Sequence, residues 1–197
     1  MNHEQHPARS DGERHEQKPS DTTPEIYVAS LADYVNGYLT GEWIDATQGI
    51  DGIRDDIAAM LATSKSEAPE GYAIHDFEGF GSLRLGEYED LERVAFIAEG
   101  VKKHGEAFAC WVDHTGLDPD DWHLFTDAYL GSYESFDAYI EQMVDDLGIE
   151  AELDRIVPAS FRSYVKIDKQ AIRRDLEAGD IWCMEFEGQT LVFNSHI

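Results

Sequence analysis

The chain has 197 residues, of which 42% are hydrophobic and 11% aromatic, and its 41 acidic residues against 15 basic ones give a net charge of −26. This apolar content is sufficient for packed cores and excludes an intrinsically disordered acidic protein. The negative charge disfavours nucleic acid and anionic membranes as partners and favours a basic protein surface.

Cysteine usage and hydropathy indicate the compartment. Cys110 and Cys183 stand in apolar surroundings without a metal-binding or redox spacing, so we expect two buried thiols in a reducing environment. No apolar run approaches the roughly 20 residues of a membrane helix. The N-terminus also shows no hydrophobic signal region. We therefore expect a cytoplasmic protein.

Residues 1–24 contain no Ile, Leu, Val, Phe, Tyr or Trp, and we expect them to form a disordered tail. The tail holds three scattered histidines, His3, His6 and His15. Scattered histidines in a segment without structure are not expected to bind a metal specifically.

Residues 25–87 predict a small α+β module. The alternating, β-branched run 26–30 predicts a strand, and the glycine-containing stretch 31–43 predicts a short helix or a loop. A second strand is expected over 72–80, after the breaker-rich stretch 65–71. Between them a helix is predicted with one apolar and one acidic side, formed by Ile50, Ile53, Ile57 and Leu61 and by Asp51, Asp55 and Asp56.

Residues 88–122 follow a helical pattern and predict a small helical bundle. One helix is expected to end at His104–Gly105, and a second carries apolar positions from Phe108 to Thr115. Asp118 followed by Pro119 is a start signal for a third helix, because it places a side-chain acceptor at the cap and proline at the first helical position. We expect this third helix to present one apolar face formed by Trp122, Phe125 and Tyr129.

Residues 123–197 again predict an α+β module. Ser135 caps the clearest helix of the chain, which Gly148 ends, and a further helix is expected over 169–178, closed by Gly179. Two strands, 181–186 and 189–193, flank the hairpin signal Glu187–Gly188. All four tryptophans fall on apolar periodic faces and are expected in cores: Trp43, Trp111, Trp122 and Trp182.

The acids concentrate in the centre of the chain. No Lys or Arg occurs in the 51 positions between Lys103 and Arg155, and 14 acids do. Asp137, Glu141 and Asp145 form a row opposite an apolar stripe, a spacing at which each like-charge pair costs roughly 0.2–0.5 kcal/mol. We interpret eleven of these acids as mimics of DNA phosphates that bind a protein partner: Asp113, Asp118, Asp120, Asp121, Asp127, Glu134, Asp137, Glu141, Asp145, Asp146 and Glu150.

The amount of charge suits such a role. One helical row spaces its charges by about 6 Å, whereas duplex DNA carries one charge per roughly 1.7 Å, so several rows would be needed together. Residues 1–24 contribute −2 of the net −26. The remaining −24 corresponds to about 40 Å of duplex.

The bases are also segregated. Six of them fall within twenty residues, with only Asp168 among them: Arg155, Arg162, Lys166, Lys169, Arg173 and Arg174. We expect either surface salt bridges or a seam where a partner subunit or an acidic segment docks. A phosphate-binding patch is a less favoured alternative.

Catalytic motifs are absent from the sequence: there is no P-loop, dinucleotide fingerprint, HExxH, GxSxG or zinc-type spacing. The best local candidate for a metal site is His75-Asp76-Phe77-Glu78. On a strand, Asp76 and Glu78 share one face and His75 takes the other, so the three are not expected to converge on an ion. We predict no catalytic residue, metal or cofactor.

Four segments, taken together and in order, are similar to those of the ArdA antirestriction family. The similarity runs from about Glu25 to the C-terminus. The segments that carry it are 26–34 (IYVASLADY) with Asn36-Gly37 and Gly41-Glu42-Trp43, 72–78 (YAIHDFE), 125–133 (FTDAYLGSY, which resembles the antirestriction motif) and 157–160 (VPAS).

The resemblance implies an elongated, non-enzymatic protein of three modules that dimerises through its last module. It further implies that the homodimer mimics bent duplex DNA and occupies the DNA-binding groove of type I restriction–modification enzymes. Such proteins are carried on mobile elements such as conjugative plasmids. The residues alone also leave open an acidic adapter or regulator without DNA mimicry and, less favoured, a metal-dependent hydrolase that uses His75, Asp76 and Glu78.

Overall fold

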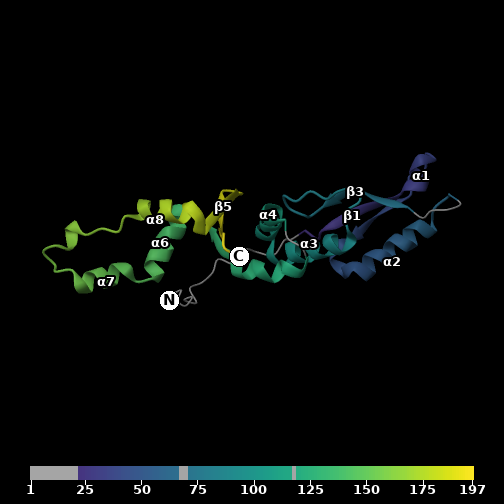
Figure 1. Cartoon of the computed structure of the whole chain (residues 1–197). Helices are drawn as coiled ribbons and strands as arrows, with labels where there is room; N and C mark the ends of the chain where they lie inside the picture. Colours follow the sequence, from purple (N-terminus) through teal and green to yellow (C-terminus); the bar gives the residue numbers. More distant parts are fainter. Residues whose placement is uncertain (1–21, 67–70, 117–118) are drawn as a thin grey trace. The chain divides into compact units, whose positions relative to one another are not determined.

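The computed structural model describes residues 22–66, 71–116 and 119–197, and these divide into two compact units at Thr126–Asp127 (Figure 1). We call them the N-terminal unit (22–126) and the C-terminal unit (127–197) and describe each by itself. Each contains helices and a small antiparallel sheet, which confirms the α+β class. The expected tail up to residue 21 and the expected cap Asp118 lie outside the described residues. The division into three modules stays a prediction.

The N-terminal unit combines a three-stranded sheet, in the order β2-β1-β3, with helices. Its elements are β1 (Glu25–Ser30), α1 (Leu31–Val35), β2 (Gly41–Asp45), the 3-10 turn η1 (Ala46–Gln48), α2 (Gly49–Ala62), β3 (Tyr72–Glu78), α3 (Leu91–His104), α4 (Glu106–Thr115), the 3-10 turn η2 (Pro119–Leu124) and α5 (Phe125–Ala128), which reaches the boundary. No helix in the described ranges has the length and apolar character needed to cross a membrane.

The predicted strands and the first long helix are confirmed. β1 and β3 lie where strands were predicted, although β3 ends two residues earlier, and α2 buries Ile53, Ile57 and Met60 while Asp51 and Asp55 stay exposed. The stretch 31–43 holds a helix and then the start of β2. β2 is an edge strand of five residues, too short for its alternation to be recognised in the sequence.

The helix α3 ends at a glycine, as predicted, and so does α4, for which no end was predicted. The Phe108 ring of α4 lies 5.7 Å from that of Phe96 in α3 and 5.3 Å from that of Phe125 in α5, and Trp111 lies 5.4 Å from Phe125. Gly100 permits this packing, because a Cβ there would lie 2.2 Å from the Phe108 ring. Trp111 is therefore a core residue, as predicted.

Two predictions for the other tryptophans are wrong. Trp43 is 42% exposed and Trp122 is 37% exposed. Trp43 lies on an edge strand, and Trp122 lies in a 3-10 turn, so neither is enclosed by neighbouring elements. Trp182 is half-buried and stacks on Phe193 at 4.1 Å.

The prediction of a third helix that carries Tyr129 on its face is also wrong. The chain forms η2 and the single turn α5, and Tyr129 begins a strand. Pairing with the last strand favours a strand over a helix at Tyr129, because Tyr129 is opposite Phe193 and their ring centroids are 5.4 Å apart.

The C-terminal unit has a second antiparallel sheet, in the order β4-β6-β5. Its elements are β4 (Tyr129–Tyr133), α6 (Phe136–Asp146), α7 (Ile149–Ile156), the 3-10 turn η3 (Arg162–Tyr164), α8 (Lys169–Asp175), the π-helical turn η4 (Leu176–Asp180), β5 (Ile181–Phe186) and β6 (Gln189–Asn194). The core gathers Phe136, Ile140 and Val144 of α6 against Val192 of β6.

Two local signals of this unit are confirmed, whereas the helix expected over 169–178 and closed by Gly179 ends as α8 at Asp175 and continues as η4 through Asp180. The Ala138 N–H donates to Ser135 Oγ at 3.1 Å, so Ser135 caps α6. The hairpin turn places Glu187 and Gly188 at φ values of 48° and 78°, the left-handed pair that a two-residue turn requires. The helix α7 was not predicted as a separate element. It begins after Gly148 and contains no buried residue.

The two cysteines differ. Cys110 is buried, as predicted, and burial raises the pKa of its thiol to about 11. Cys183 is exposed, so its predicted burial is wrong. The apolar run 181–184 does not reveal which of its residues become covered, and Cys183 stays exposed although it is directly opposite the buried Val192.

A buried carboxylate ties together three segments of the N-terminal unit. Asp33 of α1 is fully buried. Its Oδ1 accepts from Ser66 Oγ at 2.6 Å and its Oδ2 accepts from the Lys65 N–H at 3.1 Å. Burial by itself would raise the pKa of Asp33, but these bonds, with others from Thr40 and Ser64, outweigh it and hold the pKa well below its ordinary value of 3.8.

We expect Asp33→Asn to lower the melting temperature by roughly 5–10 °C at pH 7, because its amide puts a donor where the carboxylate accepts two hydrogen bonds. The depressed pKa means that this stability is present above pH 3.8 and is lost progressively as pH falls from 3.8 toward the lower pKa of the folded protein, so the difference between the two proteins should narrow toward pH 3. Thermal melts from pH 3 to 8 measure this, with exposed Asp55→Asn as the control. Equal melting temperatures at pH 7 would contradict the role of Asp33.

Candidate acidic binding surface

The predicted phosphate-mimicking acids lie on the surface wherever their side chains are described. Asp118 and the side chain of Asp120 lie outside the described residues. Two of the others belong to the N-terminal unit and seven to the C-terminal unit. All nine are exposed: Asp113, Asp121, Asp127, Glu134, Asp137, Glu141, Asp145, Asp146 and Glu150.

The helix α6 positions the densest part of this set. Ser135 fixes its start, and Phe136, Ile140 and Val144 anchor one side in the core. The row Asp137, Glu141 and Asp145 is therefore exposed on the opposite side, as predicted.

Bases of α8 neutralise the first two acids of this row. Arg173 Nη1 lies 2.9 Å from Asp137 Oδ1, and Lys169 Nζ lies 3.4 Å from Glu141 Oε1. Arg173 also pairs through Nε with Glu177 at 3.0 Å. Hydrogen bonds to Asp137 and Glu177 raise the pKa of Arg173 against the lowering effect of desolvation.

Acids of the α7 segment are also paired with nearby arginines. Arg162 pairs with both Glu150 and Asp154, and Arg155 pairs with Glu152. Four of the six bases in 155–174 thus form surface salt bridges, one of the two roles expected for this segment. Lys166 and Arg174 have no ion pair within the described parts of the chain.

Two acids at the end of α6 lack such a partner. Asp145 and Asp146 make no ion pair with any described residue, and the last turn of α6 contains no base. Carboxylates there face the negative end of the helix dipole, an unfavourable position. Asp146 also contributes, after burial, to the raised pKa of the neighbouring Tyr133. Asp145 and Asp146 therefore do not stabilise the helix, and their free charge can attract a cation of another molecule.

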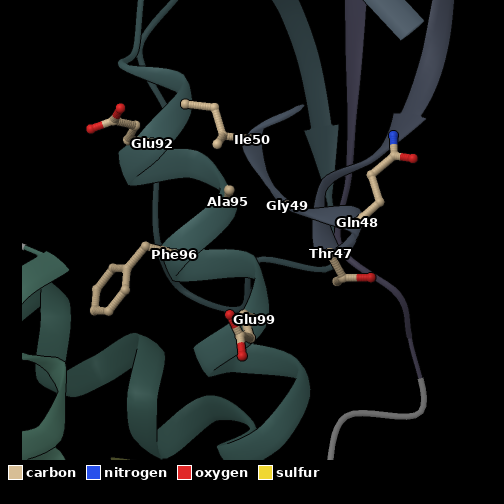
Figure 2. Close-up of a pocket in the computed structure, with 8 residues that line it drawn as sticks. All are labelled: Thr47, Gln48, Gly49, Ile50, Glu92, Ala95, Phe96 and Glu99. Carbon is tan, nitrogen blue, oxygen red and sulfur yellow. The ribbon is translucent and has the colours of Figure 1, made fainter. Parts of the chain in front are cut away.

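The N-terminal unit has a surface hollow of about 410 Å³ between α3 and the start of α2 (Figure 2). Glu92 and Glu99 flank Ala95 on the α3 side, and Thr47 to Ile50 form the opposite side. Both glutamates are exposed, so this hollow adds to the acidic surface of the unit.

The segment His75–Glu78 does not form a ligating cluster. The register of β1 and β3 shifts, with Tyr27 opposite Asp76 and Val28 opposite Ile74, so His75 is the extra residue of a bulge. His75 and Asp76 are both exposed, which breaks the strict alternation predicted for the strand. The His75 ring lies edge-on to Tyr34 at 5.2 Å. No three His, Cys, Asp or Glu side chains in the described ranges are grouped to hold a metal.

Sequence reasoning missed one group of acids. The strand register places Glu25 opposite both Asp45 and Glu78. These acids lie far apart in the sequence, and only the pairing of three strands brings them together.

A family model described as "Antirestriction protein (ArdA)" matches residues 26–186, which is most of the chain. No curated protein matches the chain.

The α6–α8 ion pairs should contribute measurably to stability in so acidic a chain. We expect Arg173→Gln to lower the melting temperature by about 2–5 °C at low salt, with a smaller effect at 0.5 M NaCl, where exposed charges are screened. Arg174→Gln is the matched control, since it removes the same charge one residue away without an ion pair. Equal shifts for both variants at every salt concentration would contradict the pairing.

Proposed function

The chain belongs to the ArdA antirestriction protein family, and from this membership and its charge pattern we propose that it acts as a DNA mimic. Its carboxylates take the place of phosphates in the DNA-binding groove of a type I restriction–modification enzyme and so exclude DNA. The family is an antirestriction family and not a known enzyme family.

The observation that carries the proposal is the exposed, base-free run of acids. Residues 104–154 contain no Lys or Arg, and every predicted mimic with a described side chain is exposed. Asp145 and Asp146 lie where their charge disfavours the helix, so stability does not account for them. A groove lined with Lys and Arg would relieve their repulsion, as it relieves that of DNA phosphates.

The protein is further proposed to act as a homodimer through its C-terminal unit. Apolar side chains from the α7 region stand in solvent: Ile156 is 59% exposed, Phe161 61% and Tyr164 81%. Exposed apolar groups in one region indicate an interface. A second copy of the chain is the partner that suits this interface. The bases Lys166 and Arg174, which have no ion pair within the described residues, lie close in sequence to these apolar residues and would offset the repulsion between two acidic chains.

Purified protein should block DNA cleavage by a type I enzyme and displace labelled DNA from its methyltransferase core, with weaker displacement as salt rises. Cleavage assays and fluorescence anisotropy measure the two effects. If tenfold molar excess leaves DNA binding untouched at low salt, the mimic proposal is wrong. Inhibition without DNA displacement would instead favour an acidic adapter.

The acids of α6 allow a finer comparison within this assay. Asp137→Asn/Glu141→Gln/Asp145→Asn should weaken inhibition only partly, because many charges share the contact. Asp145→Asn/Asp146→Asn should weaken it more than Asp137→Asn/Glu141→Gln, by about 2- to 5-fold, because Arg173 and Lys169 already neutralise the second pair. The two double variants lose the same charge and are controls for each other.

Ile156→Glu/Phe161→Glu should convert the dimer to a monomer of 22.2 kDa in light scattering, because two carboxylates would be buried in the interface. Val35→Glu/Leu39→Glu alters two apolar residues of the N-terminal unit that are even more exposed and should leave the mass unchanged. A wild-type mass of one chain would contradict the proposed dimer.

A further inference from the structure

One face of the sheet in the N-terminal unit is partly open, with Trp43 exposed and Tyr27 half-buried. α2 packs against β1 and β2 over buried Ile26, Val28 and Ile44. Tyr27 and Trp43 alternate with these residues and therefore lie on the opposite face. They are directly opposed in the register, and their ring centroids are 5.5 Å apart at an angle of 55°.

Three carboxylates share this face with the rings. Glu25 precedes Tyr27 by two residues, and Glu78 is directly opposite Glu25. Asp76 is directly opposite Tyr27. Opposed residues of antiparallel strands point to the same side. We call this surface the aromatic–acidic face: Tyr27, Trp43, Glu25, Asp76 and Glu78.

Asp45 lies on the same side, because it is also opposite Glu25, but its carboxylate is already occupied. Its Oδ1 accepts from the Thr47 N–H at 2.7 Å and from Thr47 Oγ1 at 2.6 Å. That carboxylate is therefore committed to capping η1.

The acids of the aromatic–acidic face are unfavourable for the sheet itself. Neighbouring strands lie about 4.8 Å apart, and like charges directly opposite each other destabilise a sheet. Glu25 and Glu78 are such a pair, and neither they nor Asp76 make an ion pair with any residue in 22–66, 71–116 or 119–197. One lysine in the row would have removed the repulsion.

Cations of the chain itself lie over other aromatic rings. Lys65 Nζ is 4.9 Å from the Tyr38 ring centroid, and Lys103 Nζ is 5.1 Å from that of Trp122. Within the described residues no Lys or Arg lies in this way over Tyr27 or Trp43. Two other exposed rings of the chain thus hold a cation, whereas the two rings beside the three carboxylates hold none from the described residues.

We propose that the aromatic–acidic face binds arginine side chains of a partner protein. A guanidinium group can stack on Trp43 or Tyr27 and donate to Glu25, Asp76 or Glu78 at its edge. Lysine engages the carboxylates but has no planar group to stack, and nucleic acid is repelled by the three charges. The preference for arginine follows from the residues of the aromatic–acidic face. Only the identity of the partner, a basic DNA-binding groove, rests on the proposed function.

The first test is independent of restriction enzymes. N-acetyl-arginine amide and N-acetyl-lysine amide are titrated into the full chain, and the indole N–H signals are followed by NMR. The Trp43 signal, assigned by its loss in Trp43→Leu, should shift more with the arginine probe than with the lysine probe. The shift should fall in Glu25→Gln/Glu78→Gln and persist in the charge-matched control Asp51→Asn/Asp55→Asn.

The second test uses inhibition of a type I enzyme at two salt concentrations. Trp43→Leu should weaken inhibition about 5- to 10-fold at both, because ring stacking is screened little by salt, whereas Glu25→Gln/Glu78→Gln should act mainly at low salt. Trp122→Leu removes an exposed tryptophan that already holds Lys103 and should have little effect. Trp43→Phe should restore part of the loss. Thermal melts confirm that each variant is folded.

The outcomes distinguish failure of the arginine-binding inference from failure of the proposed function. The inference is overturned if the Trp43 signal responds equally to both probes or no more than that of Trp122. It is also overturned if Trp43→Leu inhibits as well as wild type does. A wild-type protein that fails to inhibit would sink the proposed function, while the probe titration would still decide the chemistry of the face.

Discussion

Repulsion between like charges is the constraint under which the C-terminal unit folds, because α6 must hold its acids on one side of a single helix. The helix α8 reduces this repulsion, because its Arg173 and Lys169 form ion pairs with Asp137 and Glu141. Arg173 further lies over the Phe136 ring at 5.5 Å, so one side chain connects the acidic row to the core. Exposed ion pairs are individually weak, but here each also removes a repulsion.

In the N-terminal unit, neutral hydrogen-bond donors stabilise the carboxylates instead of bases. Hydroxyl and backbone N–H groups stabilise the Asp33 carboxylate, and Asp45 and Asp90 accept backbone N–H groups at the starts of η1 and α3. Helix N-termini favour negative charge. The fold therefore uses backbone amides as countercharges, which suits a chain with 15 bases for 41 acids.

Local patterns predicted the elements whose signals are local. Apolar spacing located α2, α3 and α6, and Glu187–Gly188 located the last hairpin. β2, the strand at Tyr129 and the exposure of Trp43 depend on strand pairing, which the sequence does not display. The exposure of the mimicking acids was predictable from their charge. Surface salt bridges with the basic segment were among the expectations, but the partner of each acid was not predictable, because Arg173 pairs with Asp137 from 36 positions away along the chain.

The helix α7 has a consequence for the motions of the protein. Besides its own hydrogen bonds and ion pairs, this helix of eight residues is held by the partly buried Ile149 in its first turn, and it contains no fully buried side chain. Its amides can therefore exchange hydrogen with solvent through local opening, long before the core around Val144 and Val192 unfolds. Any surface that covers α7 suppresses this opening, and ordering the segment is then part of the free energy of association.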